Sequence, residues 1–197
     1  MEELPEDLHM ILMDTLSIVS LKILSRVNKF WYNTISKYAK EQREIDLIIR
    51  CYEIASEGSL HLLKWAHNNG HRWNEATCTN AAEKGHLKML KWASSRNCPW
   101  DSNTCAYAAL NGHLEILKWA RSHGCPWDSK TCAYAAQNGH LKVLKWARTN
   151  GCSWDYLTCN KAAIYGHLEV LLWAKSNGCD WSYAIEIAKR KWPEIFT

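Results

Sequence analysis

A period of 27 residues runs through most of this chain and limits what it can fold into. One glycine column keeps this step, at Gly58, Gly85, Gly112, Gly139 and Gly166. Two tryptophan columns keep it as well, one at Trp65, Trp92, Trp119, Trp146 and Trp173, the other at Trp73, Trp100, Trp127, Trp154 and Trp181. A period of this size is typical of stacked repeat proteins, in which each unit packs only on its neighbours. We therefore expect one structural unit to be repeated along most of the chain.

One unit, residues 128–154, reads as two short helices joined by turns. Asp128 is a candidate N-cap, because its carboxylate can accept from the free amides of a first helical turn. Gly139 and Gly151, each after an asparagine, are expected to end the two helices, since glycine tolerates left-handed backbone. Two helices of about nine residues fill the 27 positions and leave no room for a strand. The predicted fold class is therefore all-α, a helix-turn-helix repeat solenoid.

We expect the array to occupy residues 47–192 and residues 1–46 to form a separate helical element. A degenerate first unit covers 47–73, four full units cover 74–100, 101–127, 128–154 and 155–181, and a half unit covers 182–192. In the half unit, charged residues replace apolar ones, as an outer cap requires: Glu186, Lys189, Arg190 and Lys191. Residues 193–197 are expected to be a tail.

The nine cysteines follow the period and show no metal or disulfide pattern. One column is Cys51, Cys78, Cys105, Cys132 and Cys159, and the other is Cys98, Cys125, Cys152 and Cys179. No Cys-x-x-Cys pair occurs, and a histidine column also keeps the step: His86, His113, His140 and His167. We expect structural thiols and imidazoles, tryptophan columns in the core, and no metal or other cofactor. Unpaired thiols suit a reducing compartment, so we expect a cytoplasmic or nuclear protein.

Charge, hydropathy and motifs argue against several classes of protein. The net charge of +4 is modest and scattered, which argues against nucleic acid. The longest apolar stretch, residues 8–24, is interrupted by Asp14 and Lys22, so we expect no membrane span. The acidic start is unlike a signal peptide. No catalytic constellation or phosphate loop is present, and we expect a monomer that is not an enzyme.

The first 46 residues read as two or three helices. Pro5 with two acids behind it favours a helix start, and Leu8, Ile11 and Leu12 lie on one face. The order Leu-Pro-x-Asp-Leu, Ile-Leu, spaced leucines and Val-Asn-Lys-Phe-Trp resembles the F-box over residues 4–35. The resemblance implies a three-helix element that docks on the Skp-type adaptor of a cullin ubiquitin ligase. The residues it implies for that contact or the local core are Leu4, Pro5, Leu8, Ile11, Leu12, Leu21, Leu24, Val27 and Trp31. The alternative is a plain helical cap on the repeat stack.

The stretch Ala-Ala-x-x-Gly-His-Leu-Glu-x-Leu-Lys, residues 108–118, resembles the central part of the ankyrin repeat. The unit is shorter than the usual repeat of about 33 residues, and Lys-Thr-Cys-Ala or Asn-Thr-Cys-Ala replaces Thr-Pro-Leu-His. The resemblance implies a trimmed ankyrin stack with short turns for fingers, and the second tryptophan column covering the side where hairpins normally lie. Short, closely similar units resemble the ankyrin families of large DNA viruses and protists.

Ankyrin repeats bind partners on the first-helix side, and the copies differ there. The pairs Thr79-Asn80, Ala106-Tyr107, Ala133-Tyr134 and Asn160-Lys161 are expected to be positions that packing leaves free. The predicted target-binding strip is Asn80, Tyr107, Tyr134, Lys161 and Tyr165, with plain solvated helix faces as the alternative. Together the resemblances imply a non-enzymatic, substrate-recruiting adaptor of an SCF-like ubiquitin ligase. The alternatives are an interaction scaffold with no ubiquitin link and, least favoured, a metal- or thiol-dependent enzyme.

Overall fold

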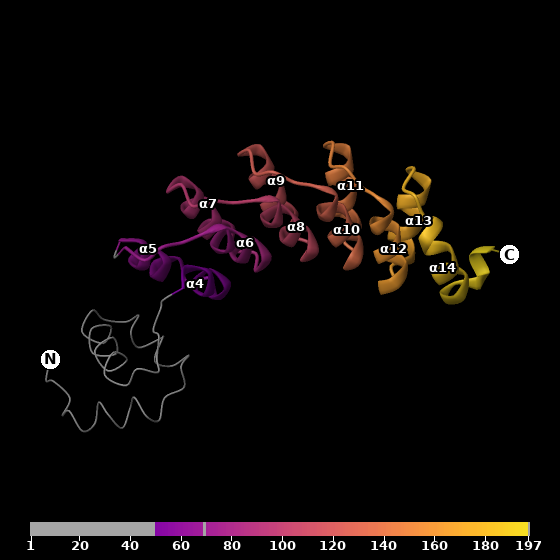
Figure 1. Cartoon of the computed structure of the whole chain (residues 1–197), viewed down its shortest axis with the longest axis horizontal. Coiled ribbons are helices and arrows are strands. Elements are labelled where there is room, and N and C mark those ends of the chain that lie inside the picture. The colour runs from indigo at the N-terminus through magenta and orange to yellow at the C-terminus, as the bar shows by residue number, and fades with distance from the viewer. Residues whose placement is uncertain (1–49, 69, 197) are drawn as a thin grey trace, which may run out of the picture. The chain divides into compact units, whose positions relative to one another are not determined.

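A computed structural model describes residues 50–68 and 70–196 of the chain (Figure 1). The predicted F-box-like contact residues, Leu4 to Trp31, lie outside the described residues. Within the described part, eleven α-helices and two short 3-10 turns are the regular elements, and no strand occurs. The predicted all-α repeat fold is confirmed.

The helices come in pairs, one pair to each repeat unit. The first helices are α4 (Cys51–Glu57), α6 (Glu75–Glu83), α8 (Ser102–Leu110), α10 (Ser129–Gln137) and α12 (Tyr156–Tyr165). The second helices are α5 (Leu60–Asn68), α7 (Leu87–Ser95), α9 (Leu114–Ser122), α11 (Leu141–Thr149) and α13 (Leu168–Ser176). The array ends in η1 (Ser182–Ala184), α14 (Ile185–Lys191) and η2 (Pro193–Phe196).

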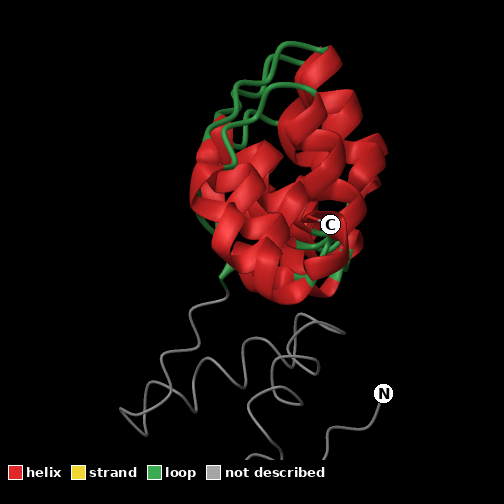
Figure 2. Ribbon diagram, turned by 90° about the vertical axis from the view of Figure 1, so that its right-hand side faces the viewer, coloured by secondary structure: helices red, strands yellow, loops and turns green. Residues whose placement is uncertain are grey.

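The helices of the array form two rows. The first helices pack directly on one another, while successive second helices make few contacts at most. Figure 1 shows the second helices spread apart above the closely spaced first helices, and Figure 2 shows the connecting loops gathered along one edge of the array. Because its members lie closer together, the first-helix row is the inner side of the curved stack.

The helix ends are fixed by local chemistry. The carboxylates of Asp101, Asp128 and Asp155 each accept from the backbone amide two residues on, at 2.9–3.0 Å. The predicted N-cap role of Asp128 is therefore confirmed, whereas the equivalent Asn74 makes no side-chain cap bond. Each bond satisfies an amide that the first helical turn leaves without a partner.

The core lies between the rows and is built from small and aliphatic residues. Its largest members include a leucine column in the second helices: Leu63, Leu90, Leu117, Leu144 and Leu171. Alanine and cysteine fill the space between first helices. The prediction that packing leaves Ala106 and Ala133 free is wrong, because both side chains are buried. Neighbouring first helices contact there, so only small residues fit.

The prediction that the tryptophan columns lie in the core is also wrong. The described tryptophan side chains are half-buried, and none belongs to the buried core. Turn tryptophans pack edge-to-face on a second-helix tryptophan of the next unit in Trp100–Trp119, Trp127–Trp146 and Trp154–Trp173, with ring centroids 5.9 Å apart. The last one, Trp181, stacks on Phe196 instead. An indole is too large for the gap between first helices, so these rings pack along the outside of the second row.

Candidate functional site

Three residues of the predicted strip meet on the first-helix face. The rings of Tyr107 on α8 and Tyr134 on α10 pack edge-to-face with centroids 5.7 Å apart. The ammonium of Lys161 on α12 lies 5.2 Å from the centre of the Tyr134 ring. It also donates to Gln137 Oε1 at 2.6 Å. The three side chains form one continuous surface across three units.

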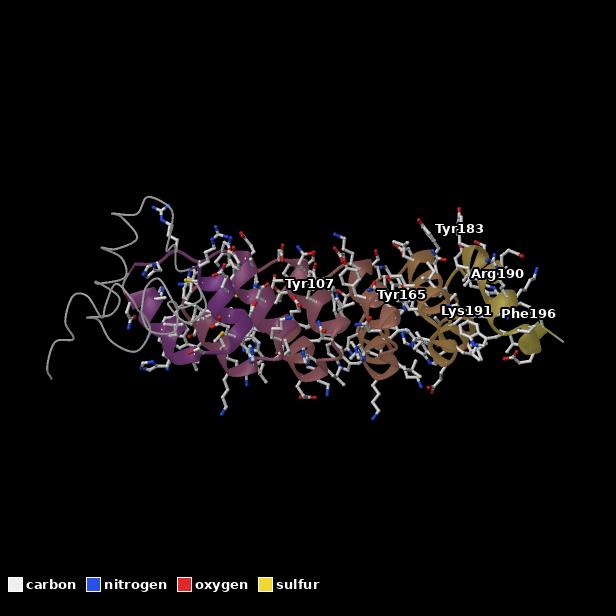
Figure 3. All side chains as sticks on the ribbon, turned by 90° about the horizontal axis from the view of Figure 1, so that it is seen from below. Tyr107, Tyr165, Tyr183, Arg190, Lys191 and Phe196 are labelled. Carbon is white, nitrogen blue, oxygen red and sulfur yellow. The ribbon has the colours of Figure 1, made fainter. Side chains whose placement is uncertain are left out.

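The other two strip residues lie in different environments from these three. The amide of Asn80 donates to the backbone carbonyl of Tyr52 at 3.0 Å, so it joins α6 to the preceding first helix. Tyr165, at the end of α12, has 53% of its surface exposed and is the more accessible ring. Figure 3, which looks onto the first-helix side, shows Tyr107 near the middle of the array and Tyr165 nearer its C-terminal end. Both residues lie on the first helices of their repeat units, so the 27-residue period alone could not show that Asn80 is engaged with the backbone while Tyr165 is exposed.

Exposed apolar side chains are concentrated toward the C-terminal end of the array, and of these the sequence analysis had named only Tyr165. The large hydrophobic side chains exposed in the described part of the chain all fall after residue 155: Tyr156, Ile164, Tyr165, Leu172, Tyr183 and Phe196. Tyr156 and Tyr183 contact each other, with centroids 4.7 Å apart. The ammonium of Lys191 donates to the carbonyl of Ile164, which brings a cation beside this end of the strip. The sequence did contain a sign of these exposed side chains. Tyr156 and Ile164 are larger or more apolar than the residues at the same positions of most other repeat units.

The recurring histidines are inter-unit contacts. The Nε2 atoms of His113 and His167 lie 3.0 Å and 2.9 Å from the carbonyl oxygens of Glu83 and Gln137 in the preceding units. Burial lowers the pKa of His140, although its bond to the carbonyl of Leu110 acts in the opposite direction. These rings therefore connect successive units, as expected for a structural column.

The comparisons with known proteins find a likeness for each part of the chain. Residues 1–41 match the F-box domain family. The array resembles the crystal structure of the human ASB11 ankyrin repeat domain, with a TM-score of 0.55 and 15% sequence identity over 66% of this chain and 69% of that one. Residues 1–41 therefore carry the match to an F-box domain, and the described array has an ankyrin-type fold. At that identity the likeness to ASB11 shows the fold alone, and no curated protein matches the chain.

The two cysteine columns of the ankyrin-type array meet within each unit. The thiols of Cys132 and Cys152 are neighbours, and Cys78–Cys98, Cys105–Cys125 and Cys159–Cys179 repeat this pairing. All nine cysteines are buried and free. The two members of a pair are 20 residues apart in the sequence. Short cysteine motifs such as Cys-x-x-Cys therefore do not reveal their contact.

The pKa values of Cys132 and Cys152 are displaced in opposite directions. The neighbouring Cys152 thiol, and then burial, raise the pKa of Cys132. The hydrogen bond from Cys132 lowers the pKa of Cys152. The Cys152 thiol also donates to the carbonyl of Asp128 at 3.3 Å, which ties it to a helix start. Across residues 50–68 and 70–196, no group of three or more His, Cys, Asp or Glu side chains could hold a metal ion.

None of the described helices combines the length and apolarity needed to cross a membrane.

Proposed function

We propose that the chain is a substrate-recruiting adaptor of a cullin-type ubiquitin ligase and does no chemistry itself. The observation that carries the proposal is the F-box match at residues 1–41. By resemblance, this element docks on a Skp-type adaptor through the predicted contact residues, Leu8 and Ile11 among them. The array then holds the protein to be ubiquitinated near the ligase.

The target-binding surface in this proposal is the first-helix face. Tyr107 and Tyr134 support each other by edge-to-face contact, and Lys161 lies against Tyr134. Rings already held in place lose little conformational freedom when a partner covers them, and tyrosine is a favoured interface residue. Exposed Tyr165 and Ile164 extend the surface toward the C-terminal end.

The histidines and cysteines support a non-enzymatic role. Both recur in every full unit and are engaged in contacts that hold the stack together. We place the protein in a reducing compartment, the cytoplasm or nucleus, because nine buried free thiols suit such conditions.

The test is direct binding of the purified full chain to a purified Skp-type adaptor. The double variant Leu8→Asp with Ile11→Asp should lose the adaptor, because carboxylates would enter an apolar contact. The matched control is Leu172→Asp, which changes an exposed leucine of α13 and should leave adaptor binding intact. If the unaltered chain does not bind the adaptor, or the double variant binds equally well, the adaptor role is lost and a scaffold without a ubiquitin link takes its place.

A further inference from the structure

The charges of the array are separated between its two rows. The second helices α5, α7, α9, α11 and α13 carry nine lysines and arginines against two glutamates. The first helices α4, α6, α8, α10 and α12 carry two lysines against four glutamates. A net charge that looks scattered along the sequence is therefore gathered on the second-helix face, which we define as the exposed surface of the second helices.

Two hollows lie between neighbouring helices of this face. One has a volume of about 510 Å³, and the residues that line it include Leu114, Leu141 and Val143 together with Lys142, Lys145 and Glu169. The other has a volume of about 280 Å³ and is lined by Lys118, Arg121, Trp127 and Trp146, among others. Both exist because successive second helices are spread apart. Each combines apolar walls with cationic rims.

Few of these cations are neutralised within the chain. Of the ion pairs among described residues, the one on this face joins Lys118 to Glu115 at 2.9 Å. Glu169 lines the larger hollow but faces two lysines there, Lys142 and Lys145, both of which are exposed. The face thus has an excess of positive charge that an external anion can meet.

The tryptophans of this face argue against nucleic acid as that anion. The guanidinium of Arg121 lies 4.1 Å from the centre of the Trp127 ring, and that of Arg148 lies 4.0 Å from Trp154. The ammonium of Lys175 lies 3.7 Å from the centre of the Trp181 ring. Single strands bind through open aromatic faces on which bases stack. Here the chain's own cations occupy those faces.

We propose that the second-helix face binds an acidic segment of a partner protein, lying across α9 and α11. Its carboxylates would meet Lys118, Lys142 and Lys145, and apolar side chains between them would enter the two hollows. This surface lies on the row opposite the predicted target strip, so the proposal does not depend on the ubiquitin role.

The probe is a fluorescein-labelled peptide in which glutamates alternate with leucines, with a glutamine counterpart and an oligothymidine of equal net charge for comparison. Binding to the full chain is followed by fluorescence anisotropy at low and high salt. We expect the glutamate peptide to bind best and to weaken with salt. Lys142→Glu with Lys145→Glu should weaken it roughly tenfold, whereas Lys84→Glu with Lys130→Glu, an equal charge change at the first helices, should alter it less than about twofold.

Zero-length carbodiimide cross-linking of the unaltered chain gives a second readout that needs no variant. Links from the peptide should form at Lys118, Lys142 or Lys145, and not at Lys130. The proposal is overturned if the glutamine peptide binds as well, if both double variants weaken binding equally, or if the links map to the first helices. Tighter binding of oligothymidine than of the peptide would overturn it in favour of a nucleic acid.

Discussion

The imidazole ring of His140 lies directly against the α-carbon of Gly112 in the preceding unit. A Cβ built on Gly112, whose φ is +74°, would stand 2.8 Å from Cε1 and Nδ1 of that ring. The same contact recurs between Gly139 and His167, where the closest approach is 2.6 Å. The Gly-His dipeptide of the period is therefore an inter-unit joint. Each histidine covers the glycine of the unit before it.

Replacing Gly112 by alanine should destabilise the array through two separate effects. Left-handed backbone costs a non-glycine residue about 1–2 kcal/mol. Crowding of the His140 ring should add roughly another 1–3 kcal/mol. Thermal unfolding followed by circular dichroism measures the loss.

The matched control for Gly112→Ala is Gly124→Ala. Gly124 has a similar φ of +83°, but a Cβ there would meet nothing within 4 Å. Gly124→Ala should therefore lose only the stability that left-handed backbone costs an alanine. Adding His140→Ala to Gly112→Ala should restore the stability lost to crowding of the ring. Equal losses for the two glycine variants would disprove the steric role of the histidine.

Asp128→Ala should cost about 1–2 kcal/mol of stability. One carboxylate oxygen of Asp128 accepts from the Lys130 amide at 3.0 Å, and the other accepts from the Ser102 hydroxyl of the preceding unit at 3.0 Å. The control is Asn74→Ala, because Asn74 occupies the same place in its unit without a side-chain cap bond. Urea titration of both variants checks the difference, which should vanish if the cap does not contribute.

Stability should fall as the pH rises above about 8.5, where unfolded cysteines ionise. The neighbouring thiol of each pair, and then burial, raise the pKa of Cys105, Cys132 and Cys159. A native pair thus keeps at least one proton that the unfolded chain loses. The stabilisation is fully present below the unfolded pKa and is lost at higher pH.

Melting temperatures measured between about pH 7.5 and about pH 9.5 test this linkage. The control is Cys132→Ala, which removes the raised member of one pair. Its stability should depend on pH less steeply, by up to about 1.4 kcal/mol per pH unit. An unchanged slope would mean that the thiols do not carry the effect.

Tyr107→Ala with Tyr134→Ala should lower stability by no more than about 1.5 kcal/mol, the contribution typical of an aromatic pair. Both rings are half-buried, and their main mutual contact is edge-to-face. Leu117→Ala, which truncates a fully buried core residue, should cost about 2–5 kcal/mol. If the tyrosine variant unfolds as readily as the leucine variant, the rings belong to the core and the strip loses its basis as a binding surface.

The sequence alone predicted the helices, their ends and the class of fold. Asp128 and Gly139 act within a few residues of themselves, one by accepting an amide hydrogen bond and the other by adopting positive φ. Such chemistry is local and can be read from the order of residues. The five strip residues were chosen from variation between copies. The structure joins Tyr107, Tyr134 and Lys161, but directs Asn80 to a backbone carbonyl.

The tertiary structure decided everything that depends on how one unit stacks on the next. It placed the His140 ring over Gly112, brought Cys132 to Cys152, and left the tryptophans half-exposed under their own cations. It also gathered the lysines of separate units onto one face. Periodicity states only that equivalent residues repeat. The close packing of the first helices and the wider spacing of the second helices determine which of them touch, and that spacing follows from packing between units.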